Sequence, residues 1–226
     1  NSAEIMYIVI PCYNEEEMLP ITARALVKKL DTLIADGRIS PASKVMFVDD
    51  GSKDKTWQII ERLHRSCELF TGLKLSRNKG HQNALLAGLM TAKNYADIIV
   101  SMDADLQDSP DEIPALRHMV LDEGYDLVSG WKKKRHDPAG KRWPSKFFNW
   151  TARIVSGIRL HDFNCGLKAY RRRVVKAIEV YGEMHRYIPI LAKQAGFKRI
   201  GEKVVEHRAR KYGHSKFGME RMVKGV

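Results

Sequence analysis

Four short, largely apolar runs, each followed by a polar loop and a stretch of helical periodicity, constrain the fold of this 226-residue chain most strongly. The runs cover 5–10, 45–48, 73–75 and 98–100. Short apolar runs bounded by turn residues are typical of strands that are buried on both faces of a sheet. Their regular alternation with helices predicts an α/β domain, with a mostly parallel central sheet and helices on both faces.

Periodicity and turn residues place the other elements of the chain. Residues 131–142 are polar and basic and contain Pro138 and Gly140, which predicts a mobile loop. A helix with an aromatic side should follow and end near Gly157. Further helices are expected over 18–35, 83–93, 111–121, 174–181 and 187–195, with one capped by Ser52 or Asp54 and ending at Arg65, and further strands over 125–129 and 197–206.

Charge is distributed unevenly along the chain. Residues 1–130 hold 14 Lys and Arg against 20 Asp and Glu, whereas residues 131–226 hold 25 against 7, a net charge of +18. Such a basic part indicates a polyanionic partner, which can be nucleic acid, an anionic membrane or a phosphorylated substrate. A basic face that is merely solvated is the alternative.

Cysteine and hydropathy patterns exclude several protein classes. The three cysteines are widely spaced and form no C-x-x-C pair, which argues against a disulfide framework or a zinc knuckle and favours a reducing compartment. No apolar run approaches the roughly 18 residues of a membrane-spanning helix. The first residues lack the charged and apolar regions of a signal peptide.

An acidic string directly follows the fourth apolar run. In an extended segment, Asp103, Asp105 and Gln107 would share one face at the carboxyl end of a strand, where open α/β sheets bind ligands. Three hard oxygen ligands suit Mg²⁺ or Mn²⁺ shared with the phosphates of a substrate. The alternative is an acidic turn that caps a helix starting near Asp111. The chain has neither a G-x-G-x-x-G nor a G-x-x-x-x-G-K-[ST] phosphate cradle, so a metal and basic side chains would have to hold any phosphates.

The last residues of the chain predict a basic amphipathic helix. Met219, Met222, Val223 and Val226 are spaced for one helical face, with basic residues on the other. Behind so much positive charge, this pattern favours contact with an anionic membrane, and core packing is the alternative.

Four motifs occur in a fixed order along nearly the whole chain: I-P-C-Y-N-E at 10–15, V-D-D-G-S-x-D at 48–54, D-A-D-L-Q at 103–107 and R-x-R-K-x-G-x-S-K at 208–216. In this order they resemble the family 2 glycosyltransferases. Within that family they resemble the polyprenyl-phosphate glycosyltransferases, such as dolichyl-phosphate mannose synthase and the undecaprenyl-phosphate glycosyltransferases. The first two motifs are common to many family 2 enzymes, whereas the last two are more specific to this group.

The resemblance implies a GT-A type nucleotide-sugar-binding fold. Residues 1–130 would form the nucleotide-sugar half, 131–216 the acceptor half, and 217–226 the start of a membrane-proximal helix. Asp162 would join Asp103 and Asp105 as a catalytic residue, although Cys165 and Gly166 stand where related enzymes carry further acid. By resemblance, the nucleotide contacts are Pro11, Tyr13, Glu15, Asp50, Arg77 and Gly80, with Asp49 bracing their loop; the metal ligands are Asp103, Asp105 and Gln107; and the phosphate and acceptor contacts are Arg142, Ser145, Arg208, Arg210, Ser215 and Lys216.

The implied reaction is an inverting, metal-dependent transfer of a sugar from a nucleotide diphosphate sugar to polyprenyl phosphate, with Mg²⁺ or Mn²⁺ as the cofactor. A UDP-sugar is expected rather than GDP-mannose, and the place of action is the cytoplasmic face of a membrane, with transmembrane helices expected after residue 226. Whether the chain forms a homo-oligomer is left open. No role as a metal ligand is expected for His81, His161 or His214, which should occupy surface or turn positions.

Two other functions remain as alternatives. The first is a family 2 glycosyltransferase with a saccharide acceptor, although its usual Q-x-x-R-W motif is missing. The second is a nucleic-acid-binding domain, which only the basic second part of the chain suggests. No nucleic acid partner is expected.

Overall fold

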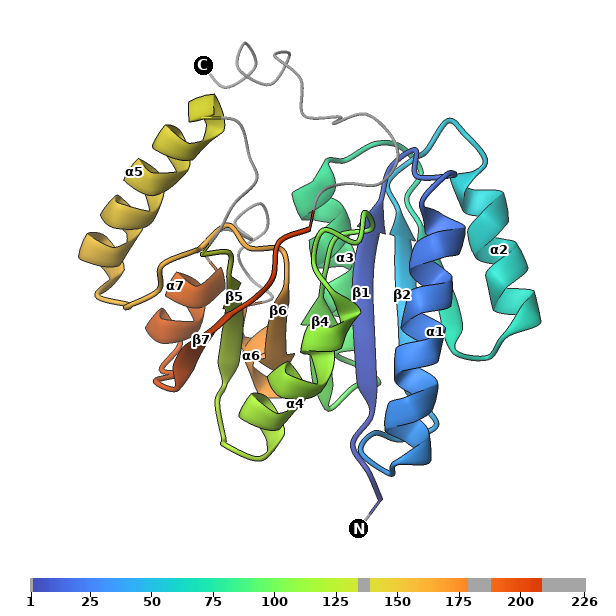
Figure 1. Ribbon diagram of the computed structural model, residues 1–226, viewed down its shortest axis with the longest axis horizontal. Helices are drawn as coiled ribbons and strands as arrows, with labels where there is room; N and C mark the ends of the chain where they lie inside the picture. The colour runs from blue at the N-terminus through green and yellow to red at the C-terminus, as the bar shows by residue number, and fades with distance from the viewer. Residues whose placement is uncertain (1, 134–138, 179–187, 209–226) are drawn as a thin grey trace.

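The structure is a computed structural model that describes residues 2–133, 139–178 and 188–208. Within these ranges the chain forms one seven-stranded sheet in the order β3-β2-β1-β4-β6-β5-β7 (Figure 1). The strand order reverses beside β1, because β2 and β3 lie on one side of it and β4 on the other. The strands are β1 (Met6–Cys12), β2 (Lys44–Asp49), β3 (Phe70–Lys74), β4 (Ile98–Ser101), β5 (Leu127–Trp131), β6 (Lys168–Arg171) and β7 (Ile200–Val204).

All the described strands except β6 point the same way. β1 pairs in parallel with β2 and β4, β2 with β3, and β5 with β7, whereas β6 is antiparallel to both β4 and β5. The carboxyl ends of the parallel strands and the amino end of β6 therefore lie along one edge of the sheet, called here the carboxyl edge. The prediction of a mostly parallel α/β sheet is confirmed.

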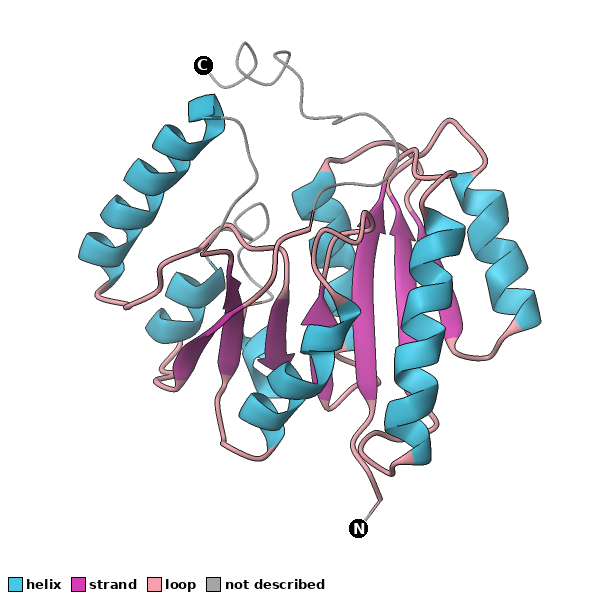
Figure 2. Cartoon of the chain, viewed as in Figure 1, coloured by secondary structure: helices cyan, strands magenta, loops and turns pink. Residues whose placement is uncertain are grey.

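Helices cover both faces of the sheet (Figure 2). The side chains of α1, α2 and α4 pack on one face, and those of α3, α6 and α7 pack on the other. The helices are α1 (Leu19–Ala35), α2 (Thr56–Ser66), α3 (His81–Ala92), α4 (Ile113–Leu121), α5 (Ala139–Ser156), α6 (Arg172–Ala177) and α7 (Ile188–Gln194), and a 3₁₀ turn, η1 (Pro110–Glu112), precedes α4.

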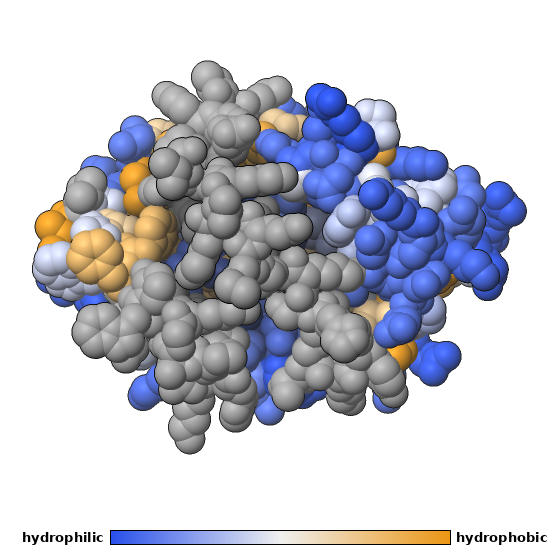
Figure 3. All heavy atoms as spheres, turned by 90° about the horizontal axis from the view of Figure 1, so that it is seen from above, coloured by the Kyte–Doolittle hydropathy of each residue, from blue (hydrophilic) through white to orange (hydrophobic). Residues whose placement is uncertain are grey.

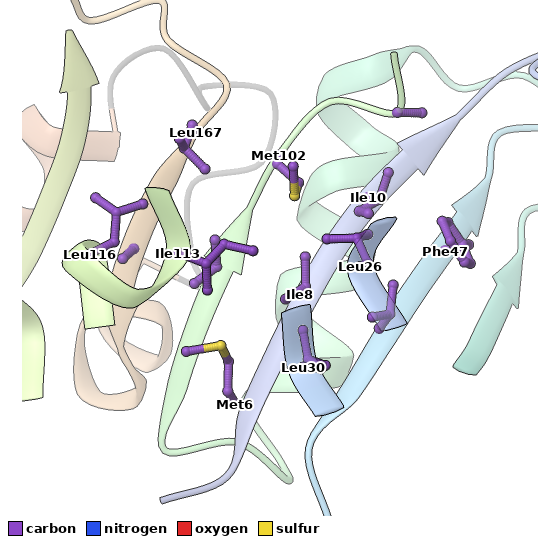
Figure 4. Close-up of a cluster of buried hydrophobic side chains, with 14 of the residues drawn as sticks. Met6, Ile8, Ile10, Leu26, Leu30, Phe47, Met102, Ile113, Leu116 and Leu167 are labelled. Atoms are coloured by element: carbon purple, nitrogen blue, oxygen red, sulfur yellow. The ribbon is translucent and has the colours of Figure 1, made fainter. Parts of the chain in front are cut away.

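Side-chain alternation along β1 explains the two hydrophobic layers. Met6, Ile8 and Ile10 point to the face covered by α1, where they meet Leu26 and Leu30 (Figure 4). Tyr7 and Val9 point to the opposite face, beneath α3. Because successive strand residues face opposite ways, a strand buried on both sides must be apolar throughout. This is why 5–10 could be recognised in the sequence.

Helix α5 stands apart from these two layers (Figure 1). Ala152 packs in a separate small cluster with Ile158, Leu160 and Phe163. The helix begins at Ala139 and β5 ends at Trp131, so the prediction of a loop over the whole of 131–142 is wrong for its first residue and for its last four. No helix within the described ranges is long and apolar enough to cross a membrane.

Candidate functional site

The loops that follow β1 and β2 are joined by hydrogen bonds at the carboxyl edge. The backbone N–H of Asn14 donates to Ser52 Oγ at 2.9 Å, and Asn14 Oδ1 accepts from the backbone N–H of Lys53 at 2.8 Å. Asn14 has a φ of 49°, which asparagine adopts more readily than most residues. The predicted nucleotide contacts Pro11, Tyr13 and Glu15 therefore lie beside the strand end that carries Asp49 and Asp50.

The loop after β2 also packs tightly against the segment that follows β3. Asp50 Oδ1 accepts a hydrogen bond from the backbone N–H of Lys79 at 2.7 Å. Gly51 has a φ of 65°, and a Cβ there would lie 2.4 Å from the carbonyl carbon of Arg77, so this approach requires glycine. Burial raises the pKa of Asp50, although the amides of Lys79 and Gly80 act in the opposite direction. Asp49 is fully buried, and its Oδ1 accepts from Ser52 N at 3.3 Å within the same turn.

The acidic string after β4 forms a turn. β4 ends at Ser101, Leu106 has a φ of 56°, and the backbone N–H of Gln107 donates to Asp105 Oδ1 at 3.2 Å. The expectation that Asp103, Asp105 and Gln107 share a face because the chain is extended is therefore wrong; the turn itself brings Gln107 back toward Asp105. The alternative of a helix cap is also excluded for this string, since Ser109 Oγ accepts from Asp111 N at the start of η1.

Asp103 sits between the nucleotide-side loops and the amino end of β6. Its Oδ1 lies 3.5 Å from Nε2 of His81, the first residue of α3. On the other side, a Cβ at Gly166 would lie only 2.7 Å from Asp103 Oδ2. No role was predicted for His81, because a lone histidine carries no spacing signal. Its position directly after Gly80, in a segment expected near the nucleotide, was the one clue that it faces the site.

The turn at 103–107 offers part of a divalent-metal site. Within the described ranges, no three side chains of His, Cys, Asp or Glu converge as a complete site. Two half-buried carboxylates with a neighbouring amide nonetheless suit Mg²⁺ or Mn²⁺, because these ions usually take one or two carboxylates and complete their shell with phosphate oxygens and water. The donor set therefore fits a cation that arrives with a diphosphate.

Two buried charges beside this turn indicate a negative local potential. Burial raises the pKa of Asp108 to about 6, and Asp103 and Asp105 add to this against the effect of Lys132. Burial acts to lower the pKa of Lys132, but the nearby acidic groups, Asp108 first and Asp103 among them, together outweigh it and hold the pKa above its usual value. A cation bound at Asp103 and Asp105 would relieve this field. Lys132 falls in the segment predicted to be a mobile loop, but its side chain is only 10% exposed and paired with Asp108.

Asp162 lies in a buried loop that leads into β6. It is only 2% exposed, and its Oδ1 accepts from the backbone N–H of Asn164 at 3.1 Å. Its own N–H and that of His161 both donate to Glu202 Oε2. His161 also pairs with Glu202 through Nδ1 and stacks on Trp131, with the ring centroids 3.9 Å apart. These contacts favour a loop-shaping role for Asp162 over contact with a substrate.

The predicted phosphate contacts are only partly described. Arg208 is exposed, its backbone N–H donates to Gln107 O at 2.9 Å, and its guanidinium lies 3.7 Å from Asp111. The backbone of Arg142 and Ser145 lies in the first part of α5, but their side chains are outside the described part of the chain. Arg210, Ser215 and Lys216 lie outside the described residues, as does the predicted helix at 217–226.

Comparison with known structures supports the fold. Glucosyl-3-phosphoglycerate synthase from Mycobacterium tuberculosis aligns with a TM-score of 0.68 and 18% identity, over 97% of this chain and 75% of that one. The same enzyme in complex with Mn²⁺ and uridine-diphosphate-glucose aligns with a TM-score of 0.66 and 18% identity, over 93% and 72%. The predicted GT-A fold is confirmed by these glycosyltransferase neighbours.

Sequence comparison identifies relatives along almost the whole chain. An undecaprenyl-phosphate 4-deoxy-4-formamido-L-arabinose transferase from Pseudomonas savastanoi is 36% identical over 96% of this chain, and one from Shewanella sediminis is 38% identical over 97%. The chain spans 61% and 64% of the length of these two proteins. Residues 7–179, which include both nucleotide-side loops, the acidic turn and Asp162, match Glycosyl transferase family 2. The chain therefore belongs to glycosyl transferase family 2.

Proposed function

We propose that the chain transfers a sugar, with inversion, from a nucleotide diphosphate sugar to polyprenyl phosphate in a metal-dependent reaction. One observation carries the proposal: Asp103 meets His81 at the nucleotide side, while Gln107, in the same turn, is hydrogen-bonded to the segment of Arg208. The acidic turn thus joins the two places where phosphates are expected. The two undecaprenyl-phosphate transferases that resemble the chain over almost its entire length support this acceptor.

In this proposal residues 1–130 bind the donor and residues 131–216 bind the acceptor. Asp103, Asp105 and Gln107 hold Mg²⁺ or Mn²⁺, which supplies charge neutralisation for the departing diphosphate. Asp50 and Arg77 contact the nucleotide, with Pro11, Tyr13, Glu15 and Gly80 around it. Arg142, Ser145, Arg208, Arg210, Ser215 and Lys216 orient the phosphates, since guanidinium groups can bind phosphate through two hydrogen bonds.

The acceptor needs little help from a general base. A phosphomonoester has a second pKa of about 6, so the phosphate group of the acceptor is mostly dianionic near neutral pH. Attack from the side opposite the diphosphate inverts the anomeric carbon. The main task of the protein is to bring two anionic groups together, which suits a site of metal and basic side chains and leaves Asp162 free to shape its loop.

Uridine is proposed as the nucleotide, because the structural neighbour binds UDP-glucose with Mn²⁺. A thermal-shift panel of UDP- and GDP-sugars, with and without Mn²⁺, tests this choice. Ligand at 100 times its Kd stabilises a protein by about 2.7 kcal/mol, which raises the Tm of a domain of this size by roughly 5–10 °C. We expect this rise for UDP with Mn²⁺; an equal rise with GDP would contradict the choice.

Transfer itself is tested with a radiolabelled UDP-sugar, Mn²⁺ and undecaprenyl phosphate in detergent. The label is expected in the lipid fraction, in a product that mild acid releases as free sugar. Robust transfer to a saccharide without the lipid would instead support the saccharide-acceptor alternative, and release of label only into water would contradict both.

Contact with an anionic membrane is proposed through α5. Phe147, Trp150 and Ile154 are 65%, 58% and 62% exposed and recur at helical spacing, whereas Phe148 and Ala152 on the inner side pack toward the small cluster at Phe163. Figure 3 shows apolar surface at the end of the molecule where α5 lies. Large exposed apolar stripes mark interaction surfaces. An acceptor with a long apolar chain is held in a bilayer, so the site must reach the membrane surface. The proposed place of action is the cytoplasmic face of a membrane.

Replacing Phe147, Trp150 and Ile154 together with serine tests this contact. Burial of each large apolar side chain contributes roughly 1.5 kcal/mol or more, so the loss of all three should lower the partition coefficient onto vesicles of phosphatidylglycerol and phosphatidylethanolamine at least about 1,000-fold. Co-sedimentation measures it. The control is Tyr95→Ser, which removes a side chain that is 56% exposed but lies outside α5. Equal binding of the triple variant and this control would contradict the assignment.

A further inference from the structure

Asp108 and Lys132 form a buried ion pair beside the acidic turn. Lys132 Nζ lies 3.1 Å from Asp108 Oδ1, and the two side chains are 10% and 0% exposed. Removing two charges from water is costly, and apolar side chains of similar volume often replace such a pair without loss of stability. The presence of the pair at the carboxyl edge therefore calls for an explanation other than stability.

Asp108 is also a junction of three chain segments. Its backbone pairs with His207 in an antiparallel bridge, and the preceding Gln107 accepts a hydrogen bond from Arg208 N. Lys132 directly follows Trp131, the last residue of β5. The acidic turn is thus held on one side by the end of β5, through the ion pair, and on the other by the chain that leaves β7, through its backbone.

Both attached segments lead toward groups assigned to phosphates. The chain after Lys132 runs to Arg142 and Ser145, and the chain after His207 carries Arg208. Trp131 O accepts from Val205 N at 3.0 Å, so the two segments also hold each other. Any shift of the turn relative to Lys132 would change the distance between the cation site and the acceptor.

We propose that the Asp108–Lys132 pair is a positioning device that sets the acidic turn at a fixed distance from the acceptor-binding segments. The proposal rests on the proposed function and adds two residues to it. Neither side chain is assigned a contact with a substrate. The pair acts through Gln107 and the backbone at 132. Because both side chains are buried, the pair holds one geometry, which a solvent-exposed ion pair would not do.

The decisive variant is the double replacement Asp108→Asn with Lys132→Met. It removes both charges at once, so the net charge of the site is unchanged and neither partner is left buried without a countercharge. If the pair only neutralises charge, the double variant should transfer sugar like the wild type. If the pair positions the turn, kcat/KM for polyprenyl phosphate should fall about 100-fold, the loss that accompanies a misplacement of about 1 Å.

Donor binding and folding are measured on the same proteins. UDP affinity in the presence of Mn²⁺, determined by calorimetry, should stay within about twofold of the wild type, and thermal unfolding should remain cooperative. The matched control is Lys133→Met, an exposed lysine one position along, which should leave kcat/KM within about twofold. Wild-type transfer by the double variant overturns the proposal. A wild-type protein that makes no lipid-linked product would instead overturn the proposed function.

Discussion

Asp103→Asn is expected to lower kcat for sugar transfer by roughly 10³-fold while the protein stays folded. The substitution keeps the size of the side chain and removes the charge proposed to hold the cation. A divalent ion contributes several kcal/mol by neutralising charge on the departing group, and each 1.4 kcal/mol corresponds to about a factor of ten in rate. The half-buried carboxylate lies 3.5 Å from His81 Nε2 and close against Gly166, so its position in the site is defined on two sides.

The measurement is kcat at saturating donor and acceptor across a Mn²⁺ titration, with bound Mn²⁺ followed by electron paramagnetic resonance. Asp103→Asn should weaken Mn²⁺ binding in the presence of UDP as well as lower kcat. Asp31→Asn, which removes an exposed carboxylate from α1, is the matched control and should behave as the wild type. A normal kcat for Asp103→Asn at any Mn²⁺ concentration would show that the cation is held elsewhere.

The fold could be predicted from the sequence because its strands are buried on both faces. Nearly every residue of β1 and β4 is apolar, and such runs stand out between polar loops. The ends of helices were less predictable where the turn preference of proline and glycine competed with packing. The glycine and proline at 138–140 suggested a loop, yet α5 begins at Ala139.

The antiparallel direction of β6 could not be predicted from the sequence. A short strand, Lys168–Arg171, reads the same in either direction, and only the pairing with both β4 and β5 decides it. This direction matters for the site. It brings the amino end of β6 and the preceding loop to the carboxyl edge, where Gly166 meets Asp103.

Site residues were predictable where a motif names them and unpredictable where contact depends on tertiary structure. The acidic turn was found through its D-x-D-x-Q spacing, although that spacing predicted an extended segment rather than a turn. His81 and Lys132 carry no spacing signal, and each is adjacent in space to an aspartate that lies 22 or 24 positions away in the sequence. The sequence therefore reveals the ligands of a site more readily than the residues that position them.

Gly166→Ala is expected to disable the site with little effect on folding. The new Cβ would lie 2.7 and 2.8 Å from the two carboxylate oxygens of Asp103, closer than real contacts allow. The loop cannot retreat easily, because Ser101 Oγ donates to Gly166 O at 3.0 Å and the buried Lys168 ammonium donates to Cys165 O. Asp103 must move instead, and we expect kcat to fall about 100-fold, as for other misplacements of about 1 Å.

Gly37→Ala should lower stability without affecting transfer, and it serves as the control. Gly37 has a φ of 67°, and a Cβ added there would have no atom within 4 Å, so alanine is strained by its backbone alone. It should lower the free energy of unfolding by about 1 kcal/mol and leave transfer unchanged. Gly166 does not have a positive φ, so its alanine variant should unfold within about 1 kcal/mol of the wild type. Full activity and normal Mn²⁺ dependence in Gly166→Ala would show that the position of the Asp103 carboxylate does not limit the reaction.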